Sequence, residues 1–147
     1  MPALRLFILS CMALSWSVFA QAQLSFNDAY VRGLPPGQPN TAAFMRILNG
    51  SSRAIRIDDV STPIAAKAEF HAHIHKDGMM KMEAVKSITI PATGFFALKP
   101  GGYHLMLMGL REPLRDGDKV MVEFTTDEGD SFDVELEVRS VMKEKQK

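Results

Sequence analysis

Short stretches that alternate apolar and polar residues recur along this chain from Leu24 onward, and turn residues separate them. Side chains alternate between the two faces of a strand, so this pattern predicts half-buried β-strands, and no long stretch shows a helical period. The expected strands are 26–32, 41–48, 54–60, 66–74, 79–85, 87–90, 94–98, 103–110, 119–125 and 131–138. Their regular spacing predicts an all-β fold, a single antiparallel β-sandwich with a cupredoxin-like or immunoglobulin-like Greek key.

The first 22 residues have a different character. Arg5 precedes an apolar run over 6–19, and the small residues of 20–22 follow it, which predicts a signal peptide (1–22) cleaved near Ala22. The mature domain would then be 23–147, exported to the periplasm. A retained anchor is disfavoured because the run is shorter than the roughly 20 residues of a spanning helix. A lipoprotein modified at Cys11 is disfavoured because Ser10 stands where Gly or Ala is usual.

Cleavage would remove the single cysteine and the single tryptophan of the chain. The mature domain would have neither a disulfide nor a thiolate ligand, which excludes a blue-copper centre and a cysteine-based zinc site. The formal net charge is zero, so nothing suggests nucleic acid or an anionic membrane surface as a partner, and no stable membrane insertion is expected after cleavage.

Histidine and methionine gather in one stretch of the chain, 70–110. All four histidines lie there, and so do five of the eight methionines that remain, from ten, when Met1 and Met12 are set aside. Imidazole and thioether without thiolate form a ligand set suited to copper, particularly Cu(I). The residues concerned are His71, His73, His75, His104, Met79, Met80, Met82, Met106 and Met108.

Strand alternation indicates which of these side chains share a face. The three histidines of 66–75 point one way if the strand stays extended, and His104 shares a face with Met106 on a later strand. Residues two apart on one face are separated by about 6.6–6.8 Å. One metal ion could therefore take His104 and Met106 as ligands, with others from a neighbouring strand and Met82 from beyond the turn at 76–78.

One spacing pattern resembles the signature of the periplasmic copper(I) chaperones called PCuA(C) proteins. Ten residues separate His71 from Met82, twenty-one separate Met82 from His104, and one separates His104 from Met106. The residues around these positions are also similar to that family. The resemblance implies a cupredoxin-like β-sandwich that binds one Cu(I) through these four side chains. It further implies delivery of copper to the dinuclear copper centre of cytochrome c oxidase, whose copper-bearing subunit would be a partner together with a Sco-type thiol protein.

One position departs from the family pattern. Members commonly have methionine two residues after the first histidine, and this chain has His73 there. Together with His75 it supplies possible additional ligands, and imidazole suits Cu(II) or Zn(II) better than thioether does. The expected cargo is therefore copper, with Cu(I) preferred and Cu(II) open through the extra histidines.

Other functions remain as alternatives. A periplasmic protein that buffers and stores copper, or Cu(II) and zinc, would share the chaperone's ligands. An enzyme is not expected, because no compact pair of carboxylates, nucleophile elbow or phosphate-binding loop is present in the sequence. A structural β-sandwich with incidental histidines would show no metal affinity.

Overall fold

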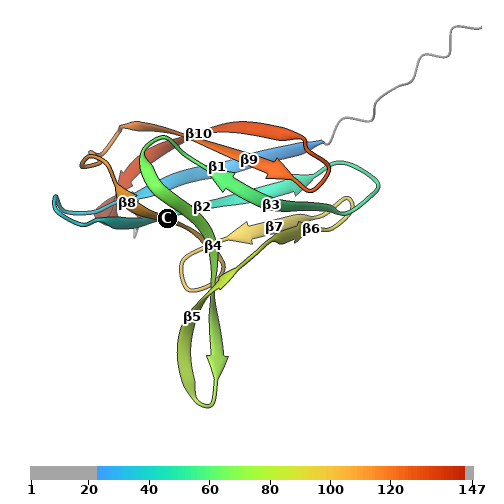
Figure 1. Cartoon of the computed structure of the whole chain (residues 1–147), viewed down its shortest axis with the longest axis horizontal. Helices are drawn as coiled ribbons and strands as arrows, with labels where there is room; N and C mark the ends of the chain where they lie inside the picture. Colours follow the sequence, from blue (N-terminus) through green and yellow to red (C-terminus); the bar gives the residue numbers. More distant parts are fainter. Residues whose placement is uncertain (1–22, 145–147) are drawn as a thin grey trace, which may run out of the picture.

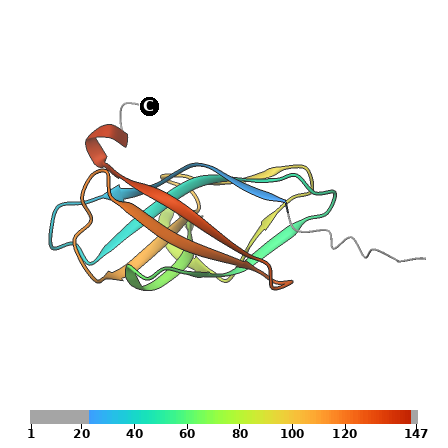
Figure 2. The same ribbon diagram turned by 90° about the horizontal axis from the view of Figure 1, so that it is seen from above.

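The computed structural model describes residues 23–144, and the predicted signal peptide lies outside them. Residues 23–144 form ten strands, in the order expected from the sequence, and one short helix that the sequence did not predict. Their bounds are β1 (Leu24–Gly33), β2 (Asn40–Asn49), β3 (Ile55–Ser61), β4 (Ala65–Lys76), β5 (Met79–Val85), β6 (Ile88–Ile90), β7 (Phe95–Leu98), β8 (His104–Leu110), β9 (Lys119–Thr126), β10 (Ser131–Ser140) and α1 (Val141–Glu144). The helix lies at one end of the molecule (Figure 2).

The strands form one continuous sheet in the order β5-β4-β8-β2-β1-β10-β9-β3-β6. Strand β7 pairs with the later part of β2, beyond the part that pairs with β8. The predicted antiparallel arrangement is confirmed for the neighbours in this order except one: β1 and β10 pair in parallel, with Tyr30 opposite Glu137. Parallel neighbours need a long crossover connection, which here is the whole chain between the first and last strands.

The sheet folds over on itself into two layers that enclose the core, as Figure 1 shows. Phe70 of β4 stacks on Phe124 of β9 with the ring centroids 6.3 Å apart, and Phe26 of β1 stacks on the same ring at 5.1 Å. Alternate residues point inward, as the sequence pattern predicted. The fully buried apolar side chains include Ile47, Ile57, Ile90, Leu105, Leu107, Val120, Val122, Leu136 and Val138. The all-β sandwich is therefore confirmed.

A two-stranded arm projects from the sandwich (Figure 1). Strand β8 pairs with β4 only from Ala65 to His71, whereas β5 pairs with β4 from Phe70 to Lys76. Beyond His71, no strand of residues 23–144 therefore lies beside β4 on the β8 side, and most of β5 is exposed. Within residues 23–144, no helix has the length and apolarity needed to cross a membrane.

Candidate metal centre

The sheet register brings several histidines and methionines of three strands onto one face. His71 on β4 lies directly opposite His104 on β8, and on the other side of β4 His73 lies opposite Met82 on β5. Met106, two residues beyond His104, lies opposite Glu69. Because opposite residues in an antiparallel pair share a face, all of these side chains emerge on the same side of β5-β4-β8.

His71 occupies the central position of this arrangement. His104 is its direct cross-strand partner, with the ring centroids 5.9 Å apart. Met82 and Met106 are its diagonal neighbours on the two adjoining strands. Diagonal neighbours lie within reach of long side chains such as methionine. The four side chains singled out by the sequence spacing therefore surround one point of the sheet.

His104 is buried and held in one orientation. Its residue is only 3% exposed, and its Nδ1–H donates to the carbonyl oxygen of Gly102 at 3.1 Å. The ring packs against Phe44 of β2, with centroids 6.5 Å apart. A carbonyl oxygen only accepts hydrogen bonds, so the proton sits on Nδ1 and Nε2 keeps its lone pair. This is the tautomer of a metal-ligating histidine whose other nitrogen is held by the protein.

The turn before β8 places the Gly102 carbonyl. Lys99 N–H donates to the Tyr103 carbonyl at 2.7 Å, and Gly102 N–H donates to the Lys99 carbonyl at 3.0 Å. Gly101 adopts a φ of 79°, a left-handed conformation that glycine accepts without steric cost. The Lys-Pro-Gly-Gly turn thus fixes both the start of β8 and the orientation of the first side chain on it.

Burial lowers the pKa of His104, and the nearby His73, His71 and Arg32 lower it further, while the bond to Gly102 opposes the shift. We expect the imidazole of the metal-free protein to titrate below the ordinary value of about 6.5. An NMR titration of the His104 ring protons checks this, and a midpoint at or above that value would contradict it.

The same shift has a consequence for stability. As pH falls below about 6.5 the unfolded chain binds a proton at His104 before the folded chain does. This histidine's contribution to the free energy of unfolding is therefore present above that pH and is lost as the pH falls toward the lower, folded-state pKa.

His71 also has one nitrogen held and one free. Its Nε2–H donates to Oε2 of Glu69 at 3.1 Å, whereas its Nδ1 is buried and has no hydrogen-bond partner among the described residues. An unpaired buried nitrogen costs free energy unless something else satisfies it. The ion pair with Lys67 and the bond from His71 hold the pKa of Glu69 below its usual range, so it stays an acceptor. The free Nδ1 is therefore ready to donate its lone pair to a metal ion.

His73 lies closer to the centre than the sequence implied. Its ring centroid is 5.2 Å from that of His104, a shorter separation than the 5.9 Å between His71 and His104. It is also the direct partner of Met82. His75 lies one step farther out on the arm, exposed, with its Nδ1 3.1 Å from the sulfur of Met80. The structure thus separates the two additional histidines: His73 joins the central group and His75 does not.

The methionines divide in the same way. Met106 is half-buried beside the two central histidines, Met82 is half exposed on β5, and Met79 and Met80 are each 58% exposed on the arm. Met108 lies opposite Lys67, away from the histidines. Within residues 23–144 no three His, Cys, Asp or Glu side chains are grouped so as to hold a metal by themselves. The candidate ligands beside the histidines are therefore methionine thioethers and not carboxylates.

Two residues of this site could not be assigned from the ligand spacing. Glu69 orients His71, and Phe44 covers one side of the His104 ring. The position of Glu69, two residues before His71 on the same strand face, is a local signal that could have identified it. Phe44 comes from β2, far away in the sequence, and no local pattern connects it to His104.

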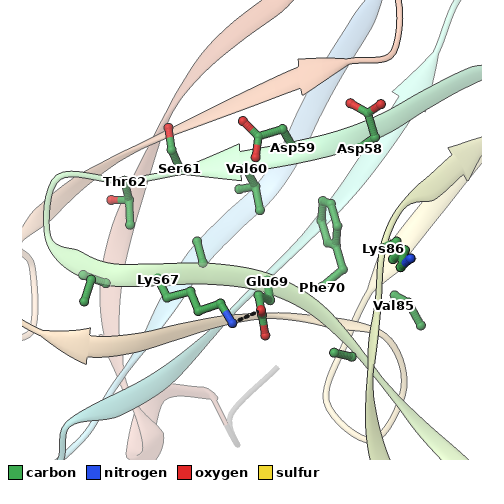
Figure 3. A pocket seen from close by; sticks show the side chains of 14 residues that line it. Asp58, Asp59, Val60, Ser61, Thr62, Lys67, Glu69, Phe70, Val85 and Lys86 are labelled. Atoms are coloured by element: carbon green, nitrogen blue, oxygen red, sulfur yellow. Dashed lines mark ion pairs between the residues drawn. The ribbon is translucent and has the colours of Figure 1, made fainter.

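A hollow of the surface lies elsewhere, between β3 and β4 (Figure 3). It has a volume of about 740 Å³, and Asp58 and Asp59 line one side while the Lys67–Glu69 ion pair lies on the other. No histidine or methionine of the described chain lines it. Glu69 lies between this hollow and the candidate metal centre, since it lines the hollow and also bonds to His71.

Comparison with known proteins agrees with this architecture. The family model described as putative lipoprotein LpqE-like matches residues 24–138. A putative lipoprotein of Leifsonia xyli subsp. xyli, Lxx21020, is 34% identical over 114 residues, which cover 77% of this chain and 68% of the relative.

Solved structures with this fold include copper proteins. The Cu(I) form of DR1885 from Deinococcus radiodurans is 33% identical and superimposes with a TM-score of 0.65 over 85% of each chain. The copper-bound PCuAC domain from PmoF2 superimposes with a TM-score of 0.68 at 16% identity, covering 83% of this chain and 97% of that domain. The resemblance to PCuA(C) proteins noted in the sequence is thereby confirmed. The chain belongs to the LpqE-like family of putative lipoproteins, and its β-sandwich is that of the PCuAC domains.

Proposed function

We propose that this protein is an exported, periplasmic copper chaperone that binds one Cu(I) through His71, Met82, His104 and Met106. The observation that carries the proposal is the pair of imidazoles on β4 and β8. Each has one nitrogen held by a protein acceptor and the other left with a lone pair, and Met82 and Met106 are the diagonal neighbours of His71. The Cu(I) form of DR1885, which is 33% identical, supports copper as the cargo.

The chemistry of the proposed ligands favours reversible transport of Cu(I) and not its permanent retention. Imidazole and thioether are neutral, and thioether is a soft ligand that accepts Cu(I) readily. An acceptor with thiolates would bind the ion more strongly, so transfer to it is favourable. In an oxidising compartment a thiolate carrier would risk disulfide formation, whereas methionine forms only a sulfoxide that is reversible.

The residues around the ligands prepare the site for the ion. Glu69 holds the Nε2–H of His71, and the Gly102 carbonyl holds the Nδ1–H of His104. Each bond fixes a ring orientation and selects the tautomer that can donate its lone pair. Burial lowers the pKa of His104, which reduces the competition of protons with a metal ion for its free nitrogen.

The acceptor follows from the family resemblance: the copper-bearing subunit of cytochrome c oxidase, with a Sco-type thiol protein as a second partner. Buffering and storage of copper is the alternative for the same ligands. The ring centroid of His73 is 5.2 Å from that of His104. This third imidazole favours storage of Cu(II) or Zn(II) as well as Cu(I) in that alternative, because both divalent ions accept nitrogen donors well.

Transfer distinguishes a chaperone from a buffer. When the Cu(I)-loaded exported protein is mixed with the copper-free soluble domain of the oxidase subunit, we expect copper to move to the acceptor, because its thiolates are the softer and stronger ligands. Separating the proteins by size and measuring copper in each fraction checks this.

A second arm, in which a dialysis membrane separates the two proteins, tests how copper moves. Transfer that slows strongly across the membrane indicates handover by contact, and an equal rate indicates release into solution. Copper that stays with this protein when the two are mixed directly would contradict delivery and leave buffering.

A further inference from the structure

The projecting arm carries pairs of imidazole and thioether on one face. His75 lies opposite Met80 and His73 lies opposite Met82, so each histidine of the arm faces a methionine across the hairpin. In the outer pair, Nδ1 of His75 is 3.1 Å from the sulfur of Met80. The outer pair uses none of the four side chains assigned to the central site, and it places two copper-type donor atoms side by side.

These pairs form a graded series. Successive pairs on one face of a hairpin are separated by about 6.6–6.8 Å, so the outer pair lies two such steps from His71. Exposure falls along the series, from 58% for Met80 at the tip to 3% for His104 at the inner end. The opposite face of the arm lacks this pattern, since Met79 there lies opposite Lys76.

We propose that His75 and Met80 form a second binding site for a soft monovalent metal ion, through which Cu(I) is exchanged with the inner ligands by way of His73 and Met82. The exchange is a substitution of neutral lone-pair donors. No electron is transferred and no proton is lost, because the imidazole proton occupies Nε2 when Nδ1 binds the ion. The passage of copper to the inner ligands rests on the proposed function, whereas the outer site does not.

Solvent exposure and the small number of ligands make this an exchange site. Two donor atoms of the described residues converge at the tip, both on exposed side chains, so the ion is held less firmly than by the central group with its buried His104. An acceptor protein can also approach the tip directly, because the arm stands clear of the sandwich (Figure 1). The inner His104, which is buried, offers no such approach.

Silver(I) tests the outer site without redox chemistry. The exported protein is titrated with Ag(I), and the methyl group of each methionine is followed by NMR. We expect the Met80 methyl to shift with a second equivalent of Ag(I) in the wild type. It should also shift in Met106→Leu, which lacks an inner ligand but keeps the outer pair. His75→Gln should abolish this response at the same Ag(I) concentration.

Met79 is the matched control. It lies on the same hairpin with the same 58% exposure as Met80, but it pairs with Lys76 and not with a histidine. Its methyl should remain unshifted at concentrations that shift Met80. Equal responses of Met79 and Met80 would show adventitious binding to any exposed thioether and would overturn the proposal.

This experiment tests the inner and outer sites separately. If Met106 and Met82 shift while Met80 does not, the outer site is wrong and the proposed function stands. If Met80 shifts while Met106 does not, the outer site stands and the central site is wrong. The exchange step has its own readout: His75→Gln should slow Cu(I) transfer to a chelator while leaving the inner affinity unchanged, and an unchanged rate would overturn that step.

Discussion

Replacing Met106 by leucine is expected to lower the affinity for Cu(I) by about 100-fold or more. Changes in the groups that merely orient metal ligands cost about 10–100-fold in affinity, so removal of a ligand should cost at least as much. Leucine and methionine are similar in volume, and such exchanges usually cost less than about 1.5 kcal/mol of stability. The loss should therefore appear in a competition titration against a Cu(I) chelator while the protein remains folded.

Met108→Leu is the matched control for this experiment. Met108 is on the same strand and the same face as Met106, and both are half-buried, but its partners are Lys67 and Asn40 and not a central histidine. Its replacement should leave the Cu(I) affinity unchanged. Equal affinities of wild type and Met106→Leu would contradict the central site, whereas equal losses in both variants would indicate a general effect on β8.

Replacing Phe124 by alanine is expected to reduce the free energy of unfolding by about 3–5 kcal/mol, the range typical of large-to-small changes at buried aromatic positions. Phe124 is completely buried on β9, and its ring stacks on Phe26 and Phe70. It therefore joins strands β1 and β4 to β9 through the core. Because an ordinary domain has only about 5–15 kcal/mol of stability, this change removes a large part of it. Denaturant unfolding followed by circular dichroism measures the loss.

Met121→Ala on the same strand provides the comparison. Met121 is 43% exposed because it points outward from β9, on the face opposite Phe124. Surface replacements usually change stability by no more than about 0.5 kcal/mol. A loss at Met121 comparable with that at Phe124 would mean that β9 is not oriented as described.

The strands could be predicted because their signal is local. Alternation of apolar and polar residues in β9 and β10, and the turn residues around them, depends only on neighbours in the sequence. The same alternation predicted that His104 and Met106 share a face. The parallel pairing of β1 with β10 was not predicted, because it joins strands from opposite ends of the chain and no local pattern reports such a partner.

By itself, the sequence determined the all-β class, and it predicted the candidate ligand types and which side chains on each strand point the same way. Only the tertiary structure decided which of them meet. The register of β4 against β8 places His71 opposite His104, and because β8 begins at His104, His73 and His75 of β4 extend beyond it on the arm. Register arises from packing over the entire sheet, and a shift of one residue would turn every side chain to the other face. For this reason the orienting contacts of Glu69 and the Gly102 carbonyl, and the separation of the inner from the outer histidines, appear only in the folded chain.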